Sequence, residues 1–191
     1  HFTCTFISSF TISLIFLLLW MGLIFFLSHQ SANQSSQLSG GMIEAVLKFI
    51  LPGLSADKLN VLISSLQFIV RKGAHFTLYT ILGFLGFFTL VTYERLALII
   101  RCLCAFLIGA VYSVTDEFHQ TFIPGRSGEL RDICIDSGGV LTGVLISLLI
   151  YKFVLLLSKK RKATRMKKKQ YIQLTETLQC ELNKTKLDLE D

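Results

Sequence analysis

The stretch FTISLIFLLLWMGLIFFL, residues 10–27, determines the class of fold. It contains no charged side chain, and an apolar run of about 18 residues or more is typical of a transmembrane helix. With its flanks it predicts a first span over about residues 6–27. Three further stretches are long and apolar enough to cross about 30 Å of hydrocarbon, at about 73–92, 96–115 and 133–157. Because a bilayer offers no water to backbone amides, we expect all four to be helices.

The composition agrees with a membrane protein. Of the 191 residues, 52% are hydrophobic and only 17% are charged, which is far from the balance of a soluble domain. The first apolar stretch is longer and more uniform than a signal-peptide core, and no basic region precedes it, so we expect a retained helix. We therefore predict one transmembrane domain over residues 1–157 and a basic tail over residues 158–191.

The segment between the first two spans, residues 28–72, predicts short helices outside the hydrocarbon. It opens with a polar run and contains two apolar patches, 42–51 and 58–70, separated by Pro52-Gly53. Each patch is too short to span, so we expect helices at the membrane interface. The alternative is a fifth span within 58–70, which would reach only about 18 Å. The predicted fold is all-α: a four-helix transmembrane bundle with short interfacial helices in its first outer loop and a basic helical C-terminal tail.

Basic residues indicate the orientation of the bundle. Most of the charge in the tail lies between Lys159 and Lys169, directly after the last span, and such segments stay in the cytoplasm. Four crossings then place both termini in the cytoplasm and the 28–72 and 116–132 segments outside. Arg71 and Lys72 oppose this assignment, but the tail carries more charge.

Polar side chains gather at the helix ends that this topology brings to one membrane face. Lys72, His75 and Tyr79 share one face of the second span. Asp116, His119 and Gln120 share a face at the end of the third, with Glu117 pointing partly aside. The set of predicted site residues is Gln30, Lys72, His75, Tyr79, Asp116, Glu117, His119, Gln120, Arg126, Arg131, Asp132 and Asp136. Ionisable residues at membrane depth are costly, so this cluster predicts a functional site.

Three chemistries fit these residue types. Glu117 and His119, with His75 and Asp116, are candidates for acid–base catalysis. The cationic side chains Lys72, Arg126 and Arg131 could hold a phosphate or pyrophosphate. We expect Tyr79, Gln120, Asp132, Asp136 and Gln30 to form a supporting polar network. The histidines and carboxylates could instead bind a divalent metal, but the nearby Lys72 and Arg126 disfavour a cation, so we assign no metal and no cofactor.

Glycines in the last span indicate close helix packing. Gly139-Val140-Leu141-Thr142-Gly143 is a GxxxG step, and small residues at this spacing let membrane helices approach closely.

The motifs in this order resemble those of the VanZ-like family. They are Lys72-x-x-His75-Phe76-x-x-Tyr79, Asp116-Glu117-x-x-Gln120, Gly125-Arg126, Asp132 and a glycine-rich last helix, and the resemblance covers about residues 10–155. It departs at Asp136, where the family pattern leads us to expect Asn. The resemblance implies a small four-helix membrane protein of the bacterial cell envelope, linked to resistance against teicoplanin, which acts on cell-wall precursors outside the membrane.

Two functions remain open at this point. The first is a cell-membrane protein that acts on or binds an anionic lipid-linked or cell-wall component at the outer face, with or without catalysis. Its partners would be membrane lipid or a lipid-linked cell-wall precursor. The alternative is a non-enzymatic structural or partner-binding protein that alters envelope properties. Nucleic acid is not an expected partner, and an oligomer is compatible with either function.

Overall fold

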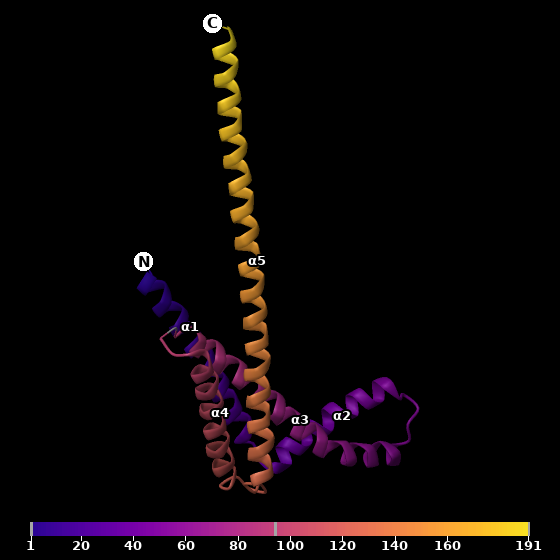
Figure 1. Ribbon diagram of the computed structural model, residues 1–191. Helices are drawn as coiled ribbons and strands as arrows, with labels where there is room; N and C mark the ends of the chain where they lie inside the picture. The colour runs from indigo at the N-terminus through magenta and orange to yellow at the C-terminus, as the bar shows by residue number, and fades with distance from the viewer. Residues whose placement is uncertain (1, 94, 191) are drawn as a thin grey trace. The chain divides into compact units, whose positions relative to one another are not determined.

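The computed structural model describes residues 2–93 and 95–190, with side chains over 9–93 and 95–179. Every regular element in these residues is a helix (Figure 1). The helices are α1 (Phe2–Ser28), α2 (Ala32–Ile50), α3 (Ala56–Val91), α4 (Leu98–Gln120) and α5 (Leu130–Glu190). All except α2 are long and apolar enough to cross a membrane. The predicted all-α transmembrane bundle is confirmed, and the chain is a multi-pass membrane protein.

The chain divides into two compact units, residues 1–148 and 149–191, with α5 contributing to both. In the first unit, α3 packs against α1, α2 and α4. Helix α2 begins with a capping box, in which Ser31 accepts from the Gln34 amide and the Gln34 side chain accepts from the Ser31 amide. It then folds back along the first part of α3, where Gln67 donates to the Ser36 carbonyl at 2.7 Å.

The region between the first two spans differs from the sequence prediction in its helix boundaries. Residues 58–70 do not form a separate short helix but the first part of α3, which runs on through residue 91. The sequence from Ser55 to Val91 contains no proline, so helical backbone hydrogen bonding continues without a break through Arg71 and Lys72. The predicted break at Pro52-Gly53 is confirmed as the turn between α2 and α3.

Hydrogen bonds to backbone carbonyls join α1 to its neighbours inside the bundle. The Trp20 indole donates to the Leu78 carbonyl of α3 at 2.9 Å, and the Tyr112 hydroxyl of α4 donates to the Met21 carbonyl at 2.6 Å. At the opposite end, the buried Arg101 donates to the Val91 and Leu96 carbonyls across the α3–α4 turn. Arg101 therefore ties this turn together.

The glycines of α5 allow its first turns to lie directly on α3. A Cβ added at Gly139 would lie 2.5 Å from the Phe76 carbonyl oxygen, and one at Gly143 would lie 2.8 Å from the Phe84 amide nitrogen. Both distances are shorter than real Cβ contacts, so a larger residue would force the helices apart. The predicted packing role of this GxxxG step is confirmed. The close approach brings the first turns of α5 beside the polar residues of α3.

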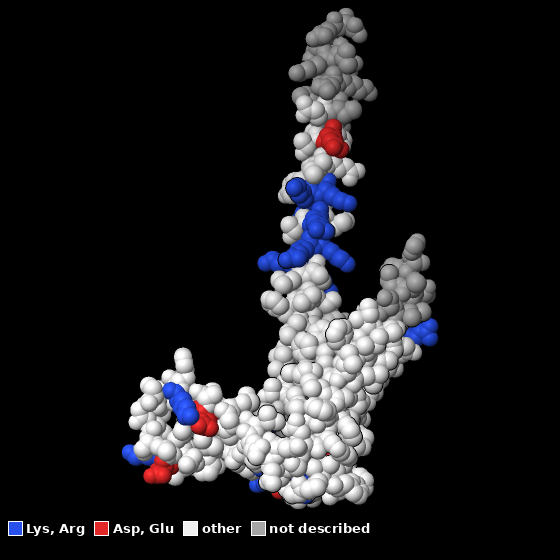
Figure 2. Space-filling model, turned by 180° about the vertical axis from the view of Figure 1, so that it is seen from behind, with Lys and Arg blue, Asp and Glu red and all other residues white. Residues whose placement is uncertain are grey.

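Charge is distributed unevenly over the surface (Figure 2). The first unit presents many exposed apolar side chains along its helices, such as Leu19, Phe26, Ile99 and Leu145. In the second unit, basic side chains gather between Lys159 and Lys169, and all of them are exposed. An apolar belt on the first unit is what a lipid environment requires.

Candidate functional site

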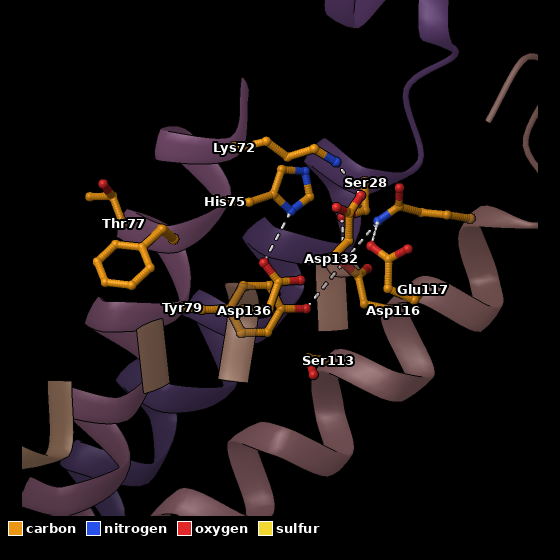
Figure 3. A network of polar contacts seen from close by, with 12 residues as sticks. Ser28, Lys72, His75, Thr77, Tyr79, Ser113, Asp116, Glu117, Asp132 and Asp136 are labelled. Atoms are coloured by element: carbon orange, nitrogen blue, oxygen red, sulfur yellow. Dashed lines mark hydrogen bonds and ion pairs between the residues drawn. The ribbon is translucent and has the colours of Figure 1, made fainter. Parts of the chain in front are cut away.

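Three helix termini and the middle of α3 bring buried polar side chains together in the first unit (Figure 3). Ser28 ends α1, Asp116 lies in the last turns of α4, Asp136 lies in the second turn of α5, and Tyr79 projects from α3. All four are at most 3% exposed. The expected convergence of these polar residues is confirmed, but α3 supplies its share from the interior of the helix and not from a helix end.

Asp116 is the centre of a hydrogen-bond network from three helices. Its Oδ2 accepts from the Ser28 hydroxyl at 2.8 Å, the Tyr79 hydroxyl at 3.1 Å and the Gln120 amide at 3.3 Å. Hydrogen bonds to a carboxylate are about twice as strong as those between neutral groups. Since all three donors approach the same oxygen, they fix the orientation of the carboxylate.

Two carboxylates of α5 face two cationic or titratable side chains of α3. The Lys72 amine forms a hydrogen-bonded ion pair with Asp132. One turn further along each helix, His75 Nδ1 lies 3.6 Å from Asp136 Oδ1, an ion-pair distance that is longer than a hydrogen bond. The predicted face of Lys72, His75 and Tyr79 is confirmed, because each of the three faces a carboxylate of a neighbouring helix.

Glu117 ties the loop between α4 and α5 to the bundle. One of its oxygens accepts from the Gln120 amide at 3.0 Å and the other from the Glu129 backbone N–H at 3.1 Å. The side-chain oxygen of Gln120, Oε1, in turn accepts a hydrogen bond from the Arg126 guanidinium at 3.0 Å. Glu117 is only 2% exposed, so the expectation that it points partly aside from Asp116 and Gln120 is wrong.

A polar pocket of about 110 Å³ lies beside this network. Its lining includes Arg71, Lys72 and His75 from α3, with Ala32 and Ser35 from α2. The opposite wall consists of Gln120, Gly125, Arg126, Ser127, Glu129 and Asp132. The pocket has space for a few waters or one small anionic group. Cationic side chains and carboxylates both line it.

The loop backbone determines where Arg126 stands. Gly125 has φ +76°, a left-handed conformation that L side chains rarely adopt. The turn is closed by the Arg126 amide, which donates to the Ile123 carbonyl at 3.1 Å, and by the Ala32 amide, which donates to the Pro124 carbonyl at 3.4 Å. The loop is thereby joined to the start of α2, and Arg126 is half-buried at the pocket wall.

Burial and the positive charge of Arg71 both lower the pKa of the Arg126 guanidinium, while the charges of Asp116 and Glu117 raise it. An arginine keeps its proton at neutral pH even so. Arg71 was considered in the sequence only as evidence on orientation, and its place in the pocket was missed. Its position four residues before His75, on the same helical face, was the signal that could have found it.

Three predicted site residues lie elsewhere. His119 stacks against Phe25 and His29 of α1, with its Nε2 3.2 Å from His29 Nδ1. Gln30 lines a separate surface hollow with His29. Arg131 is exposed and pairs with Glu129 at 2.7 Å. Conversely, Ser28 and the buried Ser113, which lies 3.4 Å from Ser137, belong to the polar interior although they are not in the predicted set.

Several carboxylate oxygens in the network receive no hydrogen bond from any described residue. They are Asp116 Oδ1, Asp132 Oδ1 and both oxygens of Asp136, and all are buried. Among the described residues, one group of at least three side chains has donor atoms close enough to hold a metal ion: His75, Asp116 and Asp136.

Comparison with known proteins decides the family. The VanZ/LLP1 family model matches residues 12–154, which include every residue that lines the pocket. The chain belongs to the VanZ/LLP1 family. No curated protein and no solved structure matches the chain. As a VanZ/LLP1 protein it is a multi-pass membrane protein, and the resemblance stated from its motifs is confirmed.

Proposed function

We propose that this VanZ/LLP1 protein binds the phosphate-bearing head group of a membrane lipid or lipid-linked cell-wall precursor in the pocket between α2, α3 and the α4–α5 loop. The carrying observation is the pair of guanidinium groups, Arg71 and Arg126, that line one pocket. Neither forms an ion pair with a carboxylate among the described residues. Two like charges in a partly buried site repel, and a phosphate accepts hydrogen bonds from both.

The other charges of the pocket support a phosphate over a carboxylate-bearing peptide. Lys72 is already neutralised by Asp132, so the available positive charge is that of the two arginines. The loop that carries Arg126 also places Gly125 in the pocket wall, and the absence of a side chain there lets the backbone approach an anion. The pocket volume of about 110 Å³ suits a phosphate group, with the rest of the lipid lying outside.

The membrane face of the pocket bears on its ligand. Lys159–Lys169 predict a cytoplasmic tail, and in the sequence the predicted last span, residues 133–157, separates this tail from the pocket residues up to Asp132. The pocket then faces the outside of the cell membrane, where lipid-linked wall precursors are used. This placement supports the link to teicoplanin resistance that the family resemblance implies. Labelling tests it: Ser127→Cys in a chain without its native cysteines should react with a membrane-impermeant maleimide on intact cells. Labelling only after permeabilisation would reverse the orientation.

Binding is better supported than acid–base catalysis at Glu117 and His119. Both oxygens of Glu117 already accept hydrogen bonds, and His119 does not line the pocket. His75 is the one proposed acid–base residue that reaches it. The alternative of partner binding draws support from the second unit, where Tyr171, Leu174 and Leu178 are exposed on a helix. Removing residues 158–191 would abolish function under that alternative and preserve head-group binding under ours.

Arg71→Ala and Arg126→Ala test the proposal, with Arg131→Ala as the matched control. Arg131 carries the same charge near the pocket but is exposed and paired with Glu129. The purified chain in neutral micelles is titrated with inorganic pyrophosphate, with phosphatidic acid and with a polyprenyl diphosphate. We expect each pocket variant to bind both lipids roughly tenfold or more weakly, from the loss of one charge-assisted hydrogen bond of about 1.5–3 kcal/mol. The control should bind them like the parent chain.

Two results would contradict the proposal. Equal lipid affinity of the parent chain, Arg71→Ala and Arg126→Ala would remove the pocket as the binding site. Tight binding of pyrophosphate without binding of either lipid would show that the ligand is a soluble anion. In cells, teicoplanin sensitivity of the two pocket variants, with unchanged amounts in the membrane, is the corresponding phenotype.

A further inference from the structure

Three side chains from three helices point toward one another beneath the pocket (Figure 3). His75 comes from α3, Asp116 from α4 and Asp136 from α5, and one donor atom of each lies within 4.8 Å of the others. Asp116 is 3% exposed and Asp136 is fully buried. The cluster is therefore assembled only when these three helices pack together.

The carboxylate oxygens of the cluster are free to bind a cation. Both oxygens of Asp136 and the Oδ1 of Asp116 are buried and accept no hydrogen bond from a described residue. A buried charged group without a partner is strongly unfavourable, so native proteins pair it or use it to coordinate a metal. His75 Nδ1, at 3.6 Å from Asp136 Oδ1, is at ion-pair distance but beyond hydrogen-bond distance, so it offsets the charge of Asp136 only when the imidazole is protonated.

The surrounding residues hold one carboxylate in position with its free oxygen available. Ser28, Tyr79 and Gln120 all donate to Asp116 Oδ2. Oriented carboxylates of this kind are a regular feature of metal sites, in which outer hydrogen bonds fix the ligand and leave its other oxygen for the ion. All three donors of this network bind Oδ2, and Oδ1 of Asp116 receives none from a described residue.

The two nearby cations do not neutralise the cluster by direct contact. The sequence analysis disfavoured a metal because Lys72 and Arg126 are close to these residues. In the structure the Lys72 amine contacts Asp132, and the Arg126 guanidinium donates to the side-chain oxygen of Gln120. Neither donates to Asp116 or Asp136. The argument against a cation therefore does not apply to this cluster.

We propose that His75, Asp116 and Asp136 bind a divalent transition-metal ion, Zn²⁺ or Mn²⁺. One imidazole and two carboxylates are the ligands such ions share, and two carboxylates balance a charge of two. Three protein ligands leave at least one coordination position open. His75 also lines the pocket, so the three-residue cluster lies next to it. The ion site does not depend on the proposed head-group binding, and each can be tested without the other.

Metal analysis of the purified full chain tests the site. The protein, without a histidine tag, is stripped with a chelator in detergent micelles, reloaded with Zn²⁺ or Mn²⁺, desalted and measured by elemental mass spectrometry. His29 and His119 are changed to Ala in this background, since their ring nitrogens lie 3.2 Å apart and could bind Zn²⁺ themselves. We expect about one ion per chain of at least one of the two metals.

Asp136→Asn and Asp132→Asn form the matched pair of variants. They make the same isosteric change one helical turn apart on α5, but Asp132 lies outside the three-residue cluster. We expect Asp136→Asn and His75→Gln each to lower the affinity for the metal ion roughly tenfold or more. We expect Asp132→Asn to retain the ion. Ser28→Ala, which removes a donor to Asp116, should weaken binding by roughly tenfold, within the range for outer-sphere partners.

Circular dichroism and gel filtration identify variants that fail to fold. If Asp136→Asn fails to fold, His75→Gln takes its place in the comparison. A folded parent chain that takes up neither metal overturns the proposal. So does equal uptake by the parent chain and the folded His75→Gln or Asp136→Asn variant. Either result means that His75, Asp116 and Asp136 do not hold the ion.

Discussion

Gly143→Ala should loosen the contact between α5 and α3 that assembles the site. The added Cβ would lie 2.8 Å from the Phe84 amide nitrogen and 2.9 Å from the Thr80 carbonyl carbon, while ordinary van der Waals contact begins near 3.4 Å. Both neighbours are backbone atoms of α3, so no side chain can rotate away and the helices themselves must move. Overpacking of this kind costs about 1–3 kcal/mol.

Gly138→Ala is the matched control. Its Cβ would meet only the tip of the Phe76 ring, at 3.9 Å. Both substitutions raise helix propensity by up to about 1 kcal/mol, and this contribution cancels when the two are compared. The difference in unfolding free energy between them is then the overpacking cost, and we expect about 2 kcal/mol or more because the atoms that the Cβ meets are backbone atoms of α3.

Trp20 is the natural probe for this measurement. It is the chain's single tryptophan, and its indole donates to Leu78 of α3. Its fluorescence would follow reversible unfolding in mixed micelles as the fraction of denaturing detergent rises, with far-ultraviolet circular dichroism as a second signal. Equal midpoints for Gly143→Ala and Gly138→Ala would refute the close approach of α5 to α3.

Three further predictions concern the polar network. Ser28→Ala removes the 2.8 Å hydrogen bond to Asp116 and should lower the unfolding free energy by about 1.5–3 kcal/mol in the same assay; a loss below about 0.5 kcal/mol would contradict a charged Asp116. A double-mutant cycle of Lys72→Met and Asp132→Asn should show favourable coupling of about 1 kcal/mol or more, because the pair is only 18% and 15% exposed; additive effects would argue against the ion pair. Gly125→Ala should cost about 1–2 kcal/mol through its positive φ, whereas Gly53→Ala, which meets no atom within 4 Å, should be nearly neutral.

The spans could be predicted from the chain alone, because an apolar run of about 20 residues has no other stable place than a bilayer. The union of 58–70 with the second span could not. A basic pair such as Arg71-Lys72 usually indicates the end of a hydrophobic segment, but it does not interrupt helical hydrogen bonding. In the structure both side chains line the pocket, and Lys72 also pairs with Asp132. The helix continues past them to Val91.

The residues of the site were predictable as a set but not in their pairing. Counting the membrane crossings placed the ends of α1 and α4 and the start of α5 at one face, together with Tyr79. It could not determine that Glu117, rather than His119, turns toward Gln120, or that His119 stacks on His29. A helix at this position can present either neighbour to the interior, and the choice depends on which partner helix lies against it.

Hydrophobicity along the chain thus accounts for the membrane class, the number of spans and the end of the bundle at which polar groups meet. These properties depend on transfer of local segments into lipid, which each segment undergoes without reference to the others. The close approach at Gly143, the arginine pair of the pocket and the free carboxylate oxygens of Asp116 and Asp136 depend on distances between helices. Such distances follow from side-chain packing among segments far apart in sequence, and they exist only once the helices are assembled.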